Sequence, residues 1–471
     1  MSFYAQKILE KSDINGMFHF QNLAIDLKYV WRNFKEPNFD GSDIDTFEKA
    51  VELRSIMIHE YQHYLDSTHT VWGVDYLFDL ERAYSHFDDP HRLQDESSFI
   101  ELMQLYEKLN SIVLPEYYQL NLCNDGKKIE KDLLKLEPTI GNIFTKYGEV
   151  GSPCFFVNYI QKRERLVRSP VSIITLLECS AIIEEISYRY AQILIELKED
   201  NLYKTISVNK FKKYIESIIY NPNLSEYFSL ILFLSQKIKD FKLLEDVWLI
   251  KILIQVCLNF TSEHFNELLK SQFMMHLLRN CNPQVDGGDF YEKLRKGIES
   301  ENRGILFLAI SLLLPSDTSY KNPEFCKEVI NKILGTIREE LTFNLLLSEA
   351  REYIEIIAES LKDSVVPYIA KIAKSIKFNL AIIHGDSDVF PPEASNAFKE
   401  NYFNGGKLSL MDLPACALDD LNIIGLYTEG ENSEDPKWNL KFASLETLEK
   451  DINDLSDRFL KVEKFVGACI D

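Results

Sequence analysis

The chain carries the stretch His59-Glu60-Tyr61-Gln62-His63 inside the apolar segment 55–65. On a helix, residues four positions apart share one face, so both imidazoles can point at one metal ion. Glu60 lies one step off that face, within reach of a water molecule bound to the same ion. This spacing is the HExxH pattern, in which two histidines bind zinc and the glutamate acts as a general base. The stretch therefore predicts a metal site on a helix.

The residues around the motif favour a buried helix from Phe47 to about Asp66. Asp45, followed three residues later by Glu48, is typical of a capping box at a helix start. No glycine or proline interrupts the segment. Apolar residues surround the motif on several sides: Val51, Leu53, Ile56, Met57, Ile58 and Leu65. The alternative is a structural helix with two satisfied core histidines and an ion-paired glutamate, although burying these groups without a metal or partners is costly.

This stretch resembles the active-site helix of the zincin metallopeptidases. The resemblance implies a zinc-dependent hydrolase in which His59 and His63 hold Zn²⁺ and Glu60 takes a proton from the zinc-bound water. A peptide or protein substrate follows from the resemblance alone. A different class stays open, namely a non-catalytic interaction protein with a structural zinc and a helical partner-binding region. A zinc hydrolase acting on a non-peptide amide is a third interpretation.

A catalytic zinc usually takes three protein ligands, so the motif needs one more. We favour Glu178, because Glu178 followed by Ala181 resembles the glutamate helix of the gluzincins, where a small residue lets two helices approach closely across the metal. Thermolysin-like members carry an aspartate one turn after the ligand, whereas this chain has Ile182. Glu185, two turns along, could orient a ligand instead. The alternative for Glu178 is a buried carboxylate paired with an arginine of the basic segment 161–168.

Two other residues are candidates for the third ligand. His69 has the spacing of the metzincin signature HExxHxxGxxH, but Asp66 stands where that signature has the glycine that turns the chain. Glu81 is near the spacing at which some gluzincins place their ligand, but it is off by one or two residues. A helix rotates about 100° per residue, so that difference matters.

Composition limits the class of protein. The chain has 471 residues and a net charge of -21, which argues against general nucleic-acid binding. Its eight cysteines include no CxxC pair, which indicates reduced thiols in the cytoplasm. No signal peptide is visible, and the apolar run 304–315 is too short to span a membrane. We therefore expect a cytoplasmic protein without a membrane segment; the sequence leaves its oligomeric state open.

The predicted fold class is α+β and predominantly α-helical. Residues 1–200 would form a zincin-like metallopeptidase domain, residues 201–376 a helical region, and residues 377–471 a C-terminal mixed α/β segment. Predicted strands cover 17–20, 24–27, 155–160 and 379–383, whereas 124–153 reads as an irregular surface excursion. Predicted helices cover 74–84, 97–114, 171–197, 211–220, 224–238, 246–260, 349–376 and 444–465, and a break is expected at Trp72-Gly73.

Overall fold

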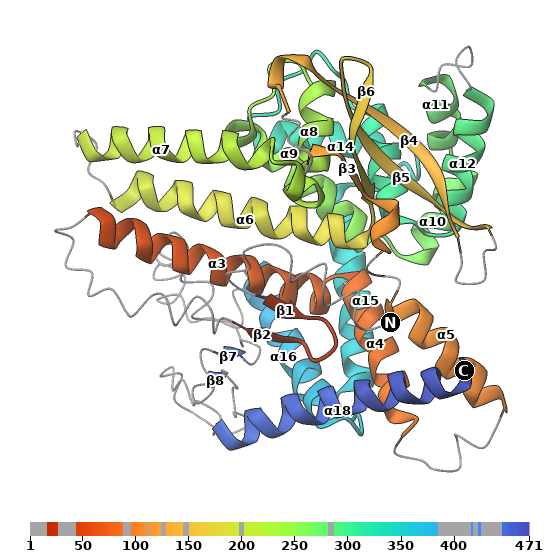
Figure 1. Cartoon of the computed structure of the whole chain (residues 1–471). Coiled ribbons are helices and arrows are strands. Elements are labelled where there is room, and N and C mark those ends of the chain that lie inside the picture. The colour runs from red at the N-terminus through yellow and green to blue at the C-terminus, as the bar shows by residue number, and fades with distance from the viewer. Residues whose placement is uncertain are drawn as a thin grey trace. The chain divides into compact units, whose positions relative to one another are not determined.

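The structure is a computed structural model, and it describes residues 17–26, 44–87, 96–110, 112, 114–123, 129–144, 150–196, 202–280, 287–384, 416–417, 423–424 and 445–470. The fold is α+β and predominantly helical, as predicted (Figure 1). The chain divides into two compact units, one comprising Met1–Ser111, Glu184–Val208 and Arg351–Asp471, the other Ile112–Ile183 and Asn209–Ala350. One boundary falls inside helix α6 (Ile173–Glu196), so this helix belongs to both units. The predicted segments 1–200, 201–376 and 377–471 follow chain order and stay a prediction.

The first unit contains a small mixed sheet beside the motif helix. Strand β1 (Met17–His19) pairs antiparallel with β2 (Ala24–Asp26), which confirms the two strands predicted there. β2 pairs parallel with β7 (Cys416–Ala417), and β7 pairs antiparallel with β8 (Ile423–Ile424). Both β1 and β2 contact helix α3 (Ile44–Thr68), which carries the HExxH stretch. A small sheet therefore lies against the motif helix.

The turn between β1 and β2 is held by tyrosines from two helices of the same unit. Tyr76 donates a hydrogen bond to the carbonyl of Phe20 (3.3 Å), and Tyr84 donates to Gln21 (2.7 Å). The hydroxyl of Tyr368 donates to the carbonyl of Leu23 (3.4 Å). These bonds satisfy backbone carbonyls of the turn, which lie outside the β1–β2 pairing, and they attach the hairpin to the helices.

Helix α3 begins at Ile44, before the predicted start, and α4 (Val71–Ser85) follows it after two residues. The break expected at Trp72-Gly73 is wrong, because both residues lie in the first turn of α4. Thr70 is the N-cap of α4; its hydroxyl accepts from the amide of Gly73 (3.0 Å) and donates to the carbonyl of Asp66 (2.6 Å). Thr70 therefore bonds both the last turn of α3 and the first turn of α4.

This unit also contains α5 (Glu96–Asn110), α16 (Pro367–His384), α18 (Leu445–Ile470) and part of α15 (Phe343–Leu361). The single helix predicted over 349–376 is two helices, and Pro367 starts the second, where a missing amide costs nothing. The strand predicted at 379–383 is wrong, since these residues continue α16. A short apolar run has no periodicity that separates a strand from a buried helix.

The second unit contains an antiparallel sheet in the order β3-β6-β5-β4. Its strands are β3 (Leu120–Asn121), β4 (Leu134–Phe144), β5 (Val150–Gln161) and β6 (Glu164–Val171). The strand predicted at 155–160 is confirmed within β5. The irregular excursion predicted over 124–153 is wrong where β4 covers 134–144 and β5 covers 150–153, and its parts 124–128 and 145–149 lie outside the described residues. Pro138 and Gly141 read as breakers, yet β4 is an edge strand, where a proline is tolerated. Gln236 bonds the free edge of β4, accepting from Leu136 N (2.7 Å) and donating to Leu134 O (2.9 Å).

Helices make up the rest of the second unit, and α8, α12 and α13 pack on the sheet. In chain order they are α7 (Leu202–Ile219, shared with the first unit), α8 (Ser225–Lys237), α9 (Leu243–Asn259), α10 (Ser262–Lys270), α11 (Gln272–Asn280), α12 (Gly287–Glu299), α13 (Arg303–Leu313) and α14 (Pro323–Leu334). The predicted helices at 211–220, 224–238 and 246–260 are confirmed as α7, α8 and α9. Within the described part of the chain, every helix is too short or too polar to cross a bilayer.

Candidate metal centre

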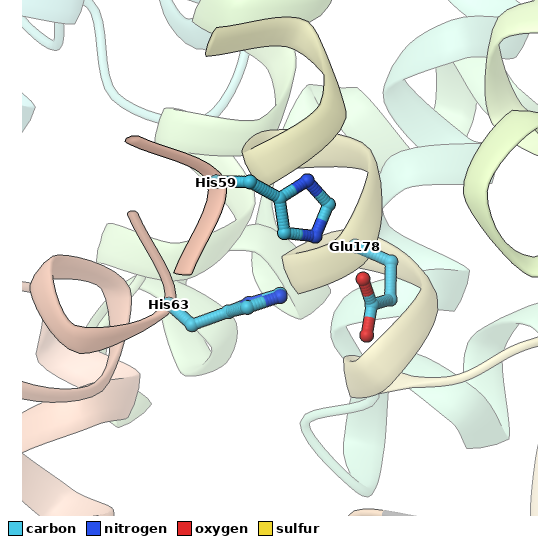
Figure 2. A group of neighbouring side chains, drawn as sticks. All are labelled: His59, His63 and Glu178. Atoms are coloured by element: carbon cyan, nitrogen blue, oxygen red, sulfur yellow. The ribbon is translucent and has the colours of Figure 1, made fainter. Parts of the chain in front are cut away.

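Helix α3 places His59 and His63 one turn apart, and α6 supplies Glu178. Figure 2 shows the two imidazole rings and the carboxylate directed toward a common point. One ligand atom from each residue lies within 4.8 Å of the other two, so the group could hold a metal ion. Ligands about 2.1 Å from a tetrahedral ion lie about 3.4 Å apart, so the three ligand atoms would have to come closer together to bind one.

The three side chains are almost withdrawn from solvent. His59 is 8% exposed, His63 3% and Glu178 4%. A buried carboxylate and two imidazoles are costly unless charge or hydrogen bonds compensate them. One bound cation would offset the cost of burying all three groups, so the residues present fit a metal ion.

Aromatic rings of the β1–β2 hairpin pack against the second histidine of the motif. The Phe18 ring stacks on the His63 ring, with centroids 6.3 Å apart and an interplanar angle of 27°. The Phe20 ring lies 6.1 Å from the same imidazole and is tilted against it. The two phenylalanines restrict the rotamers of His63 and exclude water from that side.

Glu185 faces the first histidine of the motif. Its Oε2 lies 3.2 Å from Nδ1 of His59, and its Oε1 lies 3.6 Å from a guanidinium nitrogen of Arg189. Ile182, one turn after Glu178, is buried and apolar. The carboxylate next to His59 therefore comes from the second turn after Glu178, as the sequence suggested. Sequence reasoning missed Arg189, although its i,i+4 spacing from Glu185 is a visible signal.

A second carboxylate, Glu226 on α8, belongs to the electrostatic surroundings of Glu178. Burial and, as the smaller cause, the negative charge of Glu178 together raise the pKa of Glu226 to about 7. Nothing in the local sequence pattern marks Glu226, because α8 reads as an ordinary amphipathic helix. A cation bound by Glu178 would offset the negative charge of Glu178, and the pKa of Glu226 would then be raised less.

The other predicted residues lie elsewhere. His69 is outside the group that could hold a metal; its Nδ1 is 2.7 Å from the Thr68 hydroxyl, and burial lowers its pKa to about 3. Glu81 accepts a hydrogen bond from the Ser364 hydroxyl (3.1 Å). Glu60, the predicted general base, is buried in α3 beside His59.

The basic segment 161–168 spans the turn between β5 and β6. Lys162 and Arg163 form the turn itself, and residues 164–168 belong to β6. Lys162 and Arg163 occupy the left-handed region, with φ of 52° and 68°. Arg168 donates to the carbonyl of Tyr118 (3.0 Å) and lies over the Phe156 ring. These contacts show that Arg168 has a structural role in the sheet.

Comparison with known proteins returns no match: no family model fits the sequence, and neither a curated protein nor a solved structure matches it significantly. The interpretation of the site therefore depends on its own residues.

Proposed function

We propose that the protein is a zinc-dependent metallopeptidase in which His59, His63 and Glu178 bind Zn²⁺. The observation that supports this proposal is the grouping of the two motif histidines with a carboxylate distant in sequence. Two histidines and one carboxylate are a common ligand set of catalytic zinc sites, which leave a fourth position to water. The same donors also suit non-haem Fe(II), so the identity of the metal has to be measured.

The bound ion would supply a water molecule with a pKa lowered toward about 7. The chain's own residues would do the rest. Glu60 would accept a proton from that water and donate it to the leaving amine, which is the general-base role of this position in the HExxH pattern. Phe18 and Phe20 pack against the His63 ring and would limit its rotation before an ion binds.

A structural metal site in an interaction protein is the second candidate function. The near-complete burial of the three ligand side chains favours it, because structural sites are closed whereas catalytic sites admit substrate. In that case Glu60 would have no proton to move, and its replacement would leave the protein's function unchanged.

The test begins with elemental analysis of protein purified without chelators. We expect about one zinc per chain, and none in His63→Ala, since the coordination set then loses a ligand. Glu60→Gln should keep metal and fold but lose cleavage of a peptide library read by mass spectrometry, because an amide cannot accept the proton. Glu52→Gln, two turns earlier on α3, is the matched control.

Each outcome is decisive. A wild-type protein that contains no transition metal and cannot be loaded would defeat the proposal. Full cleavage by Glu60→Gln would remove Glu60 as the base. Stoichiometric zinc with no cleavage of any peptide by the wild type would favour the structural site.

A further inference from the structure

We infer that Glu185 and Arg189 are positioning residues that fix the tautomer and orientation of His59. The inference rests on the metal site of the proposed function, and it does not require hydrolysis. Both residues lie on one face of α6, four positions apart, and Glu185 stands between Arg189 and His59.

The carboxylate of Glu185 uses its two oxygens for different partners. Oε2 is the atom 3.2 Å from Nδ1 of His59, and Oε1 is the atom 3.6 Å from the Arg189 guanidinium. A carboxylate contacted at both oxygens cannot rotate freely about its last bond. In this proposal Arg189 restrains the rotation of the Glu185 carboxylate through the 3.6 Å ion pair and helps to direct it toward the imidazole.

The chemistry of histidine ligands gives this contact its role. A neutral imidazole has one N–H and one lone pair, and a metal takes the lone pair. A carboxylate at 3.2 Å favours the proton on Nδ1 and leaves the lone pair on Nε2. The contact is a close approach whose angle does not meet hydrogen-bond geometry, so the ring has to turn slightly for the Nδ1–H to align with Oε2. Outer partners of this kind fix ring orientation and raise ligand basicity, and losing them costs about 10–100-fold in metal affinity.

The sequence of α6 shows why Glu185 takes this role. One turn after Glu178 the chain has Ile182, which is buried and offers no acceptor. The next residue on that side is Glu185, and the following turn brings Arg189. Replacing Glu185 or Arg189 therefore acts on His59 without removing a ligand atom.

The test measures zinc affinity by competition with a chromophoric chelator. Glu185→Met keeps the side-chain length but removes both oxygens, and it should weaken zinc binding about 10–100-fold. Glu185→Gln keeps one acceptor and should lie between Met and wild type. Arg189→Lys should stay near wild type and Arg189→Met should weaken binding less than Glu185→Met. Glu184→Met, the adjacent residue on the same helix, is the matched control.

A second readout needs no metal. Nitrogen chemical shifts of ¹⁵N-histidine in the metal-free protein, recorded at a pH at which those shifts themselves report a neutral His59 ring, should show the His59 proton on Nδ1. Glu185→Met should lose that preference, while its metal-free thermal unfolding stays unchanged.

The inference is overturned if metal-free His59 carries its proton on Nε2, or if Glu185→Met binds zinc as tightly as Glu184→Met. Absence of peptide cleavage would count against the proposed function alone. If the wild type binds no zinc, the proposed function fails, and the tautomer measurement still decides whether Glu185 positions His59.

Discussion

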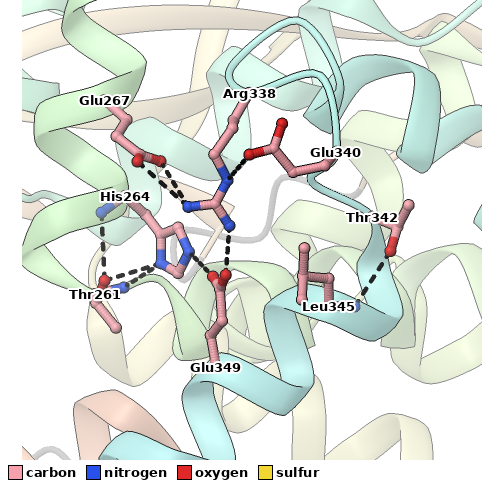
Figure 3. A network of polar contacts seen from close by, with 8 residues as sticks. All are labelled: Thr261, His264, Glu267, Arg338, Glu340, Thr342, Leu345 and Glu349. Carbon is pink, nitrogen blue, oxygen red and sulfur yellow. Dashed lines mark hydrogen bonds and ion pairs between the residues drawn. The ribbon is translucent and has the colours of Figure 1, made fainter.

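Nε2 of His264 lies 2.8 Å from Oε2 of Glu349, and the imidazole is buried (Figure 3). The other nitrogen, Nδ1, accepts from the amide of Thr261 (3.2 Å), so Nε2 carries the proton and donates to the carboxylate. His264 thus acts as the third residue of a capping box, a place that glutamate or glutamine usually takes. Arg338 bonds the second oxygen of Glu349 and also contacts Glu267 (3.3 Å).

This network makes Glu349 a stability residue of the second unit. Glu349→Gln removes the charge that Arg338 and His264 both face, and we expect a loss of about 1–2 kcal/mol in the free energy of unfolding. Urea denaturation would measure it. Glu340→Gln is the matched control, because Glu340 contacts the same arginine (3.4 Å) but its side chain is 67% exposed, so its loss should be under about 0.5 kcal/mol. Equal losses in both variants would contradict a special role for Glu349.

Gly73 permits the tight junction between α3 and α4. A Cβ at this position would lie 2.2 Å from the carbonyl oxygen of Asp66 and 2.5 Å from the carbonyl carbon of Ser67, both backbone atoms that cannot move aside. Gly73→Ala should therefore cost about 3 kcal/mol or more. At Gly335 the nearest atom would lie 3.2 Å away, a contact that a shift of a few tenths of an ångström relieves, so Gly335→Ala should change stability much less than Gly73→Ala. Thermal unfolding of the two variants side by side tests this, and similar melting temperatures would contradict the α3–α4 geometry.

Stability should depend on pH through His69. Burial lowers its pKa from 6.5 to about 3 in the folded protein. The unfolded chain therefore binds more protons between these values, so this contribution is fully present above pH 6.5 and is lost as the pH falls toward 3. The slope is up to about 1.4 kcal/mol per pH unit for one such group.

His69→Gln removes this titration. With a chelator present in both samples, the difference in unfolding free energy between wild type and variant should grow as the pH rises from about 4 to 6.5. The raised pKa of Glu226 acts in the opposite direction, but it is common to both proteins and cancels in the difference. A difference that does not change with pH would show that His69 is not buried as a neutral ring.

Local sequence patterns were sufficient for the elements that carry the candidate site. The helix around His59 and the helix around Glu178 both follow from uninterrupted apolar periodicity, and their bounds were predicted within a few residues. Strand β4 was missed because Pro138 and Gly141 mark a break locally, whereas the edge position that tolerates Pro138 is a property of the whole sheet. The run at 379–383 was misread because Pro367 starts a helix that continues through it.

In the candidate site, too, residues marked by a local sequence pattern were predicted, whereas residues related only through the fold were not. His59 and His63 are found by spacing alone, and Glu178 by its resemblance to a glutamate helix. Arg189 was missed although its i,i+4 spacing from Glu185 is visible in the sequence, whereas Glu226 was missed because its nearness to Glu178 depends on how α6 and α8 pack. Contacts between residues far apart in the chain need the fold before they can be recognised.

The third ligand can be decided by comparing two variants. Glu178→Ala removes an anionic ligand atom from the group, so zinc affinity should fall by more than about 100-fold, beyond the loss expected for an outer partner. His69→Ala should change affinity by less than about 3-fold, because the ring contacts Thr68 and is outside the group. Chelator competition measures both. The opposite ranking would indicate a metzincin-like turn at Asp66 that brings His69 to the metal. Equal and mild losses would leave a site of two histidines, and the structural interpretation would then be the better one.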